Sequence, residues 1–284
     1  MRARLALVPL LLLAATTAHG ACPDAAEVDA FIQDYQAARV TRGMPAVQTL
    51  DDARCAQAAV VQRLQGVFGP VVGYKAGLTN PAMQKRLGVD QPVSGVMMNG
   101  MFLPDGSEFD VGAAARPLYE ADFIMVVKDG PGLARARSLQ EAARSIAYVV
   151  PFIELPDLMF DPALKLTGPG LVAIDAGARH GVLGKPIPMQ TDDAFIQSLA
   201  TMTVVLLEDG RELAKGPGSA IMDNPLNSAM WLARDLASVG IELKPGDKLS
   251  LGSFLPAQPP RAGTKGTVQY LGLPGDPIVS VSFK

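Results

Sequence analysis

Three acidic residues interrupt two otherwise apolar segments of this chain. Glu120 and Asp122 lie in LYEADFIMVV (residues 118–127), and Glu154 lies in VVPFIELPDL (residues 149–158). Because side chains alternate along a strand, Glu120 and Asp122 point to the same face of the predicted strand. Carboxylates that face a core need a cation or a shared proton. A set of oxygen ligands favours a hard cation, with Mg²⁺ the most natural and Mn²⁺ or Ca²⁺ as alternatives.

The same acids have a structural explanation. They could lie on a solvated sheet face or pair with Arg116 or Arg179, and spacing alone does not separate this arrangement from a metal site. Lys75, in the strand-like segment GYKAG, is open to two interpretations as well. Its ammonium could hold a carboxylate substrate near a metal or carry a proton, or it could be an edge-strand lysine that reaches solvent.

The histidines and cysteines exclude several kinds of site. The chain has two histidines, His19 and His180, so a multi-histidine zinc site is excluded and a Ser-His-Asp triad would have to use His180. We interpret His180 as a solvated or structurally bonded side chain. Neither Cys22 nor Cys55 has a CxxC partner, which excludes the usual redox and metal motifs. In an oxidising compartment the two cysteines could form a disulfide.

The N-terminus has the features of a secretory signal peptide. Residues 1–20 contain two arginines, an apolar run and a small-residue end, and the run is too short to span a bilayer. We therefore expect export to the periplasm. A net charge of −3 and a pI near 5.5 give no electrostatic reason to expect nucleic-acid binding. The composition, 49% hydrophobic and 19% charged, is that of a folded chain, and no other segment predicts a membrane span.

The elements that must position these residues form an α+β pattern. Two N-terminal helices are followed by many strands without regular βαβ alternation, and residues 161–192, rich in Gly, Pro and Ala, are left without a predicted element. We predict a signal peptide at 1–20, a helical cap at 21–69 and a catalytic domain at 70–284. The predicted helices span residues 26–40, 51–65, 81–87, 138–148 and 226–240, and the predicted strands include 71–78, 118–127, 149–158 and a hairpin with its turn at Asp209-Gly210.

Four segments, in this order, resemble one family. They are GYKAGLTNPAMQKRLGVDQPVSG, YEADFIMVV, PFIELPD and NPLNSAMWLARDLASVGIELKPGDKLSLGSF. They look like the 2-keto-4-pentenoate hydratase and 4-oxalocrotonate decarboxylase family of the fumarylacetoacetate hydrolase superfamily, over roughly residues 25–284. The resemblance implies a mixed β-roll with a small N-terminal helical cap, assembly into homo-oligomers, and Mg²⁺-dependent chemistry on short 2-keto or 2-hydroxydienoate acids.

The resemblance also implies a metal site. The family's E-x-E metal motif falls on Glu120 and Asp122, and its third acidic ligand falls on Glu154. Asp157 matches a family acid that we interpret as orienting or charge-balancing the site. The ion implied is Mg²⁺, with Mn²⁺ possible.

The substrate groups are carried over in the same way. The family's G-x-K-x-G lysine falls on Lys75, which we predict to be catalytic. Leu78 and Thr79 belong to the segment whose backbone amides help to hold the substrate carboxylate. Asp175 and Ser253 are the other predicted substrate-binding residues. The metal would chelate the keto oxygen and one carboxylate oxygen of the substrate and so stabilise an enolate.

Two departures from the family pattern concern the reaction. Hydratases of this family usually carry an acid in the QPD-x-G segment, where this chain has Val93. The family's D-N-A-S-S-like loop reads Ile174 to Ala178 here and lacks the serine hydroxyls. The metal platform therefore looks preserved, whereas the groups that transfer protons and select the substrate look altered.

Three functional hypotheses follow. The first is a Mg²⁺-dependent lyase, of hydratase or decarboxylase type, that acts on a small keto acid. The second is an exported keto-acid binding protein on the same fold that has lost catalysis. The third is a hydrolase that cleaves a C–C bond of an acylpyruvate, for which His180 or Asp175 would have to activate water.

Overall fold

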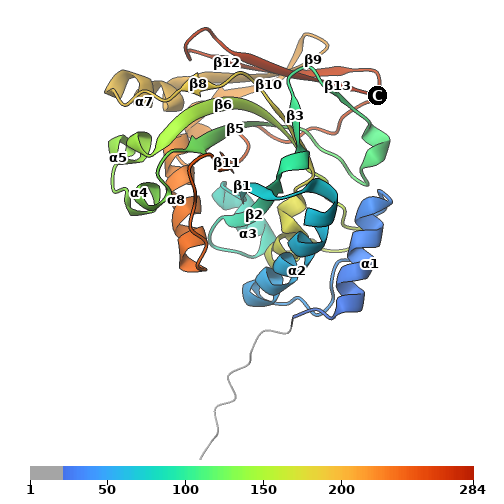
Figure 1. Ribbon diagram of the computed structural model, residues 1–284. Helices are drawn as coiled ribbons and strands as arrows, with labels where there is room; N and C mark the ends of the chain where they lie inside the picture. Colours follow the sequence, from blue (N-terminus) through green and yellow to red (C-terminus); the bar gives the residue numbers. More distant parts are fainter. Residues whose placement is uncertain (1–21) are drawn as a thin grey trace, which may run out of the picture.

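The molecule consists of a large curled β-sheet, a smaller second sheet and an N-terminal helical cap (Figure 1). The computed structural model describes residues 22–284, so the predicted signal peptide lies outside the described residues. The helices are α1 (Ala25–Gln36), α2 (Leu50–Phe68), α3 (Pro81–Leu87), α4 (Gly130–Arg135), α5 (Leu139–Arg144), α6 (Gly168–Ala173), α7 (Asp193–Thr201) and α8 (Pro225–Ser238). The strands are β1 (Val71–Gly77), β2 (Val93–Met98), β3 (Phe102–Pro104), β4 (Glu108–Phe109), β5 (Glu120–Val127), β6 (Ile146–Leu155), β7 (His180–Leu183), β8 (Ile187–Pro188), β9 (Thr203–Glu208), β10 (Arg211–Pro217), β11 (Lys248–Ser250), β12 (Lys265–Leu271) and β13 (Ile278–Phe283).

The larger sheet is strongly curled into a roll. Its strand order is β2-β1-β11-β5-β6-β7-β3, and β8 pairs with β6 outside this path. The first and last strands of this order, β2 and β3, are consecutive in the chain and are joined by a single 3₁₀ turn, Asn99–Met101. Only a strongly curled sheet lets such a short connection reach from one edge to the other. Together with the helices, this roll confirms the predicted α+β class and mixed β-roll.

The two faces of the roll differ in character. Residues that pair across adjacent strands point to the same face, so the registers place Lys75, Gly95, Asp122, Glu154 and Ser250 on one face. A small apolar cluster of Met97, Ile124, Val150 and Phe152 fills the other end of this face. We call it the inner face. The outer face contributes Ala121, Phe123, Met125 and Ile153 to the main hydrophobic core.

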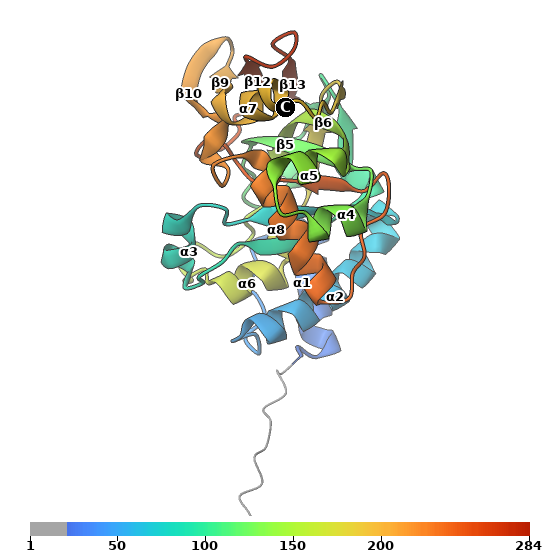
Figure 2. The same cartoon turned by 90° about the vertical axis from the view of Figure 1, so that its left-hand side faces the viewer.

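The smaller sheet, β10-β9-β12-β13-β4, packs on this outer face. The predicted hairpin is confirmed as β9 and β10, with Asp209 and Gly210 both in the left-handed conformation that a two-residue turn needs. The Tyr270 hydroxyl of β12 shares its one hydrogen between the backbone carbonyls of Asp122 and Phe152 and so ties the two sheets together. Helix α8 packs beside α4 and α5 on the flank of the roll (Figure 2).

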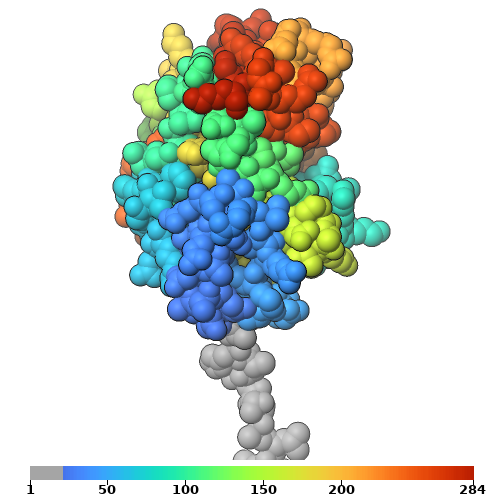
Figure 3. Space-filling model, turned by 90° about the vertical axis from the view of Figure 1, so that its right-hand side faces the viewer, coloured from blue at the N-terminus to red at the C-terminus, as the bar shows by residue number. Residues whose placement is uncertain are grey.

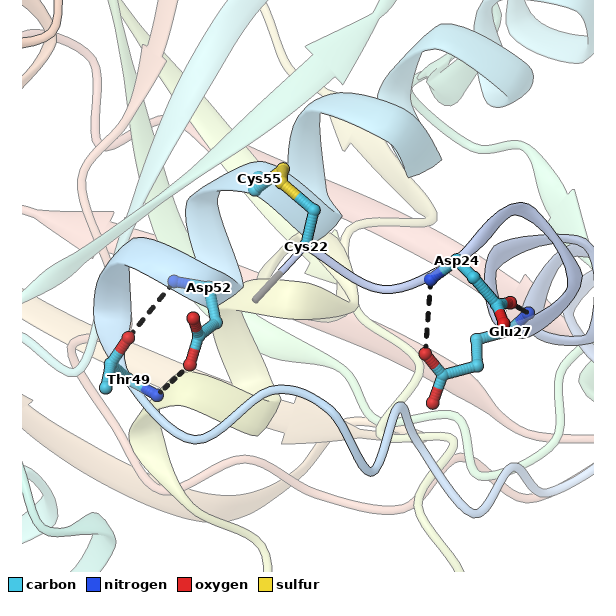
Figure 4. Close-up of a disulfide and its surroundings, with 6 residues drawn as sticks. All are labelled: Cys22, Asp24, Glu27, Thr49, Asp52 and Cys55. Atoms are coloured by element: carbon cyan, nitrogen blue, oxygen red, sulfur yellow. Dashed lines mark hydrogen bonds between the residues drawn. A yellow bond between two sulfur atoms is a disulfide. The ribbon is translucent and has the colours of Figure 1, made fainter. Parts of the chain in front are cut away.

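The N-terminal cap lies at the end of the molecule opposite the C-terminal strands (Figure 3). Reciprocal capping boxes begin both of its helices, Asp24 with Glu27 for α1 and Thr49 with Asp52 for α2 (Figure 4). A Cys22–Cys55 disulfide joins the segment before α1 to α2, with the two Cα atoms 5.5 Å apart, in agreement with the hypothesis that these two cysteines pair. The cap shares its apolar core with α6 and β2.

Two predicted helices are wrong at their C-terminal ends. The helix expected over residues 26–40 ends at Gln36, four residues early. The helix expected over residues 138–148 ends at Arg144, and β6 begins two residues later at Ile146. The Ser138 side chain accepts from the Glu141 amide, but the Glu141 carboxylate accepts from Arg137 instead of closing the box. The β-branched run from Ile146 onward favours a strand that extends into the core.

The region left without a predicted element, residues 161–192, contains α6, the 3₁₀ turn η3 (Asp175–Gly177), β7 and β8. No helix within residues 22–284 is both long and apolar enough to cross a membrane.

Candidate active site inside the roll

The three predicted metal ligands lie on the inner face of two central strands. Glu120 of β5 and Glu154 of β6 are direct cross-strand partners, and Asp122 follows two residues after Glu120 on the same face. Asp122 and Glu154 are buried to 0% and 2% exposure, whereas Glu120 is partly exposed. The strand alternation expected from the sequence is therefore present, and it gathers three carboxylates at one end of the roll.

Lys75 lies among these acids. It sits on β1, between Gly95 of β2 and Ser250 of β11, so β1 is an interior strand and the edge-strand interpretation is wrong. Its ammonium forms an ion pair with Glu154 and donates to the carbonyl of Ala176 at 3.1 Å. Burial would lower the pKa of Lys75, but the nearby carboxylates outweigh burial and raise it. Lys75 is therefore a buried cation.

The acids outnumber that cation. Ser250 donates its hydroxyl to Asp122 Oδ2, and the Leu251 amide donates to Oδ1 at 3.2 Å. Even so, burial and then the charge of Glu154 raise the pKa of Asp122 well above its usual range. Burial, followed by the charge of Glu154, raises the pKa of Glu120 to about 7, although Lys75 acts in the opposite direction. Three carboxylates against one ammonium leave an excess of negative charge that needs protons or a further cation.

The donor set fits a divalent cation in chemistry and in charge. All three side chains offer oxygen, the ligand type that Mg²⁺ and Mn²⁺ prefer, and a doubly charged ion would balance the two excess carboxylates. Within residues 22–284, no three Asp, Glu, His or Cys side chains already converge as a metal-binding group. Glu154 is held by Lys75 instead. The ligand set Glu120, Asp122 and Glu154 stays a prediction.

The turn that accepts the hydrogen bond from Lys75 has a strained backbone. Asp175 and Ala176 are both left-handed, with φ of 56° and 51°, and such a pair of non-glycine residues persists only when its surroundings hold it. Asp175 Oδ1 accepts from the Val96 amide at 2.8 Å and from the Gln57 side chain at 2.9 Å. Asp175 Oδ2 is buried without a hydrogen-bond partner within the described residues. Burial raises the pKa of Asp175 to about 7.

Gln57 is a contributor that the sequence analysis missed. It lies on the buried face of α2, otherwise formed largely by Ala53, Ala56, Val60 and Leu64. A polar residue in this apolar stripe was the available signal, because a buried amide needs partners. The predicted substrate-binding role of Asp175 stays a prediction, since its carboxylate is turned toward α2 and β2.

Two loops lie next to the start of β5. Leu78 is left-handed, with φ of 55°, and Thr79 packs so closely on Gly252 that a Cβ there would lie 2.6 Å from the threonine hydroxyl. Ser253 donates its hydroxyl to the Leu255 carbonyl at 2.6 Å and lies 3.3 Å from the Ala121 carbonyl oxygen. The structure thus brings together the loops that carry Leu78, Thr79 and Ser253. Their contacts with a substrate stay predictions.

Val93 lines the inner face. It pairs with Gly77 in the register of β1 and β2, two residues beyond the Lys75–Gly95 pair, and it is 4% exposed. Its side chain therefore points to the same side of the sheet as Lys75. The position at which related hydratases were expected to carry an acid is an apolar part of the wall.

Asp157 belongs to a separate cluster. It accepts hydrogen bonds from the backbone amides of Ala115 and Arg116 at 2.9 and 2.7 Å, and from the Arg179 guanidinium at 3.2 Å. The same guanidinium lies 4.3 Å from the ring centre of Tyr35 in the cap. None of these bonds reaches the predicted metal ligands, and the predicted orienting role of Asp157 at the metal stays a prediction.

His180 faces away from the acids. It pairs with Leu155, the neighbour of Glu154, so its side chain points to the opposite face of the sheet. Phe68 and Phe109 flank the imidazole at 5.5 and 5.9 Å between ring centres. Burial lowers the pKa of His180, and the charge of Arg179 lowers it further. This environment agrees with the interpretation of a structurally packed histidine.

Several proteins with enzyme names are similar to this chain in sequence. A 2-keto-4-pentenoate hydratase from Burkholderia vietnamiensis is 34% identical over 188 residues, covering 66% of this chain and 69% of the relative. The TodF product hydratase from Pseudomonas putida is 32% identical over 228 residues, covering 79% and 81%. A 4-oxalocrotonate decarboxylase from Pseudomonas putida is 28% identical over 248 residues, covering 86% and 90%. No protein-family model matches the chain.

Solved structures share the fold. The 4-oxalocrotonate decarboxylase from Pseudomonas putida G7, complexed with magnesium and adipate, gives a TM-score of 0.79 at 27% identity and covers 91% of this chain and 96% of its own. A fumarylpyruvate hydrolase from Pseudomonas aeruginosa, in complex with Mn²⁺ and pyruvate, gives a TM-score of 0.53 at 14% identity, with 74% and 88% covered. The second similarity concerns the fold alone.

Proposed function

Because the chain belongs to the 2-keto-4-pentenoate hydratase and 4-oxalocrotonate decarboxylase family, we propose that it is a divalent-metal-dependent lyase for short 2-keto or 2-hydroxydienoate acids. The predicted family resemblance is confirmed, and the chain is an enzyme, as its named relatives are. The observation that carries the proposal is the excess of buried carboxylates around Lys75 on the inner face of the roll.

The residues of the site divide the work. Glu120, Asp122 and Glu154 would hold Mg²⁺ or Mn²⁺, which, when bound, supplies Lewis-acid polarisation of the keto acid's oxygens. Lys75 offsets the negative charge of the substrate and is placed to exchange a proton with it. The backbone of Leu78 and Thr79 would orient the substrate carboxylate. The burial of Asp122 and Glu154 keeps water away and strengthens each of these electrostatic contacts.

Val93 bears on the type of reaction. Addition of water across a double bond requires a group that delivers or positions the water and its proton, and Val93 can do neither. Loss of CO₂ breaks a C–C bond and leaves its electron pair in the enolate of the product, which then takes up a proton that Lys75 is placed to supply, so no water has to be positioned. The apolar wall at Val93 therefore favours decarboxylation over hydration as the reaction of this chain, with hydration as the second candidate.

Turnover assays test the proposal. Purified protein with Mg²⁺ or Mn²⁺ is offered 2-hydroxypentadienoate, 4-oxalocrotonate and an acylpyruvate, and product formation is followed spectroscopically. We expect metal-dependent turnover that Glu120→Ala abolishes. Saturable binding of a keto acid without product would favour the exported binding protein, and acylpyruvate cleavage would favour the hydrolase. No turnover and no binding with any acid would overturn the proposal.

We also propose that the protein is exported to the periplasm and forms a homo-oligomer. The Cys22–Cys55 disulfide supports export, because disulfides persist in oxidising compartments. Cell fractionation of the producing bacterium checks the first statement, and retention of the protein with the cytoplasmic fraction would contradict it. Light scattering on the purified protein checks the second, and a monomer would contradict it.

A further inference from the structure

The cap reaches the site through one side chain. The Gln57 amide nitrogen donates to the Ser94 carbonyl of β2 and to Asp175 Oδ1, both at 2.9 Å. Gln57 is 9% exposed, and the acceptors of both hydrogen bonds lie outside the cap. A buried primary amide with both hydrogens used is a rigid link between the elements that it joins.

The second partner, Asp175, opens the left-handed turn next to Lys75. Two hydrogen bonds hold its Oδ1, one from Gln57 and one from the Val96 amide. The following residue, Ala176, is also left-handed, and its carbonyl oxygen accepts from the Lys75 ammonium at 3.1 Å. Gln57 is therefore linked to Lys75 through one hydrogen bond to Asp175 and the carbonyl of the next residue, Ala176.

Lys75 has little freedom in this position. A Cβ at Gly95 would lie 2.8 Å from Lys75 Cγ, 3.0 Å from the Asp175 carbonyl oxygen and 3.1 Å from Ala176 Cβ. The lysine side chain thus runs between β2 and the turn, and only a glycine leaves it room. A small movement of the turn changes where the ammonium meets Glu154.

Packing alone does not explain Gln57. Helix α2 already buries Ala53, Ala56, Val60 and Leu64. The Cys22–Cys55 disulfide and the Arg54–Asp235 ion pair, at 2.8 Å, hold the helix as well. An apolar side chain at position 57 would be enough to pack the helix. The role of the amide is therefore to form its two hydrogen bonds.

We propose that Gln57 is a positioning residue that sets the Lys75 ammonium through the Asp175–Ala176 turn, which makes the cap a working part of the active site. This inference rests on the proposed function of Lys75. It predicts that Gln57 acts on the chemical step without touching the substrate, so its loss lowers kcat and leaves KM nearly unchanged.

The kinetic test compares Gln57→Met with Gln62→Met in the full mature chain loaded with Mg²⁺. Methionine has nearly the size of glutamine and a good helix propensity, but it donates no hydrogen bond. Gln62 is an exposed residue of the same helix. We expect kcat to fall about 10-fold or more in Gln57→Met and to stay unchanged in Gln62→Met. Unchanged kcat in Gln57→Met, or a rise in KM alone, would overturn the inference.

A spectroscopic test does not depend on turnover. A buried, ion-paired lysine ammonium exchanges its protons slowly, and its ¹⁵N–¹H signal is assigned to Lys75 by its loss in Lys75→Met. We expect this signal to shift or broaden in Gln57→Met and to stay in place in Gln62→Met. An identical Lys75 signal in Gln57→Met would overturn the inference, even if the wild-type protein turned over no substrate.

A third variant covers misfolding. Gln57→Leu also removes the two-hydrogen donor and presents an apolar side chain of similar size to the apolar face of α2, so it decides the same question if Gln57→Met does not fold. If the wild type is active and the Gln57 variants have the same kcat and the same Lys75 signal, the positioning role of Gln57 is overturned and the proposed function stands. An inactive wild type with a displaced Lys75 signal in the variants would overturn the proposed function and leave the positioning role standing.

Discussion

The chain buries two acid clusters that differ in how their charge is balanced. Asp157 meets Arg179 and two backbone amides, so one carboxylate has one cation and a full set of donors. On the inner face, Glu120, Asp122 and Glu154 gather around Lys75, and within residues 22–284 no other ammonium or guanidinium forms an ion pair with them. A cluster whose charges balance contributes to the stability of the fold. A cluster with excess negative charge can instead bind a metal ion or take part in binding a substrate.

Position in the fold reinforces the difference. The Asp157–Arg179 pair joins the end of β6 to Tyr35 of the cap, and its guanidinium also donates to the Tyr35 carbonyl at 3.2 Å. It holds the cap on the roll. The Lys75 cluster lies on central strands, and the registers of these strands fix which side chains lie on the inner face. The first cluster should therefore govern stability, and the second should govern activity.

The largest expected effect is the loss of activity in Lys75→Met. Removing the ammonium leaves the substrate carboxylate and Glu154 without their cation, and kcat should fall by about 10³-fold or more. Lys248→Met is the matched control, because Lys248 lies at the other end of the inner face with its ammonium 5.3 Å from the Phe102 ring centre. Both variants are measured by steady-state kinetics. Equal losses of kcat would show that Lys75 has no special role in the reaction.

The next effect concerns the balanced cluster. Asp157→Asn leaves Arg179 buried without its counter-charge, and the free energy of unfolding should fall by about 3 kcal/mol. Urea denaturation measures it, with Asp161→Asn, a neighbour on the following loop, as the control. If Asp157→Asn kept its stability but lost kcat, the division between the two clusters would be wrong, and the orienting role at the metal would gain support.

The disulfide should contribute comparably to stability. Cys22 and Cys55 close a loop with a sequence separation of 33 residues, and constraining such a loop in the unfolded chain contributes about 2–4 kcal/mol. We expect Cys22→Ser/Cys55→Ser to lose this amount in urea denaturation while retaining kcat in its folded form. A large loss of kcat at full stability would show that the cap affects the site through this bond as well.

The smallest effect is a dependence of stability on pH. The pKa of Asp175 is about 7 in the folded protein, against about 3.9 in an unfolded chain. The folded state therefore binds the extra proton, and its stability falls as pH rises from about 4 to about 7. The loss from this group between pH 5 and pH 7 should be at most about 2 kcal/mol. Asp175→Asn should have a flatter profile in urea denaturation across these pH values, and an unchanged slope would contradict the assignment.

Strand alternation allowed part of the site to be predicted from the sequence. It placed Glu120 and Asp122 on one face, and the register of β5 confirms this. The contact of Lys75 with Glu154 could not be predicted in the same way, because it depends on the strand order β1-β11-β5-β6, which brings residues 79 positions apart into contact. Taken by itself, the GYKAG motif favoured an edge-strand lysine until this order was known.

The missed parts have physical reasons too. The turn at Asp175 and Ala176 contains two non-glycine residues in left-handed conformations, which local sequence does not predict. Gln57 looked like one polar residue among alanines of a helix, and its role depends on acceptors 37 and 118 residues away. Helical periodicity identified the elements of the cap, but it could not show that one of them reaches the active site.

The dependence of oxalate binding on Mg²⁺ tests the central claim most directly. Oxalate offers the same pair of oxygens as a 2-keto acid and does not react, so calorimetry of the wild type, Glu120→Gln and Asp122→Asn reports on the inner face alone. We predict that the wild type binds oxalate with Mg²⁺ and not without it, and that both variants lose this binding. Oxalate binding that needs no metal, or that survives unchanged in both variants, would contradict the account.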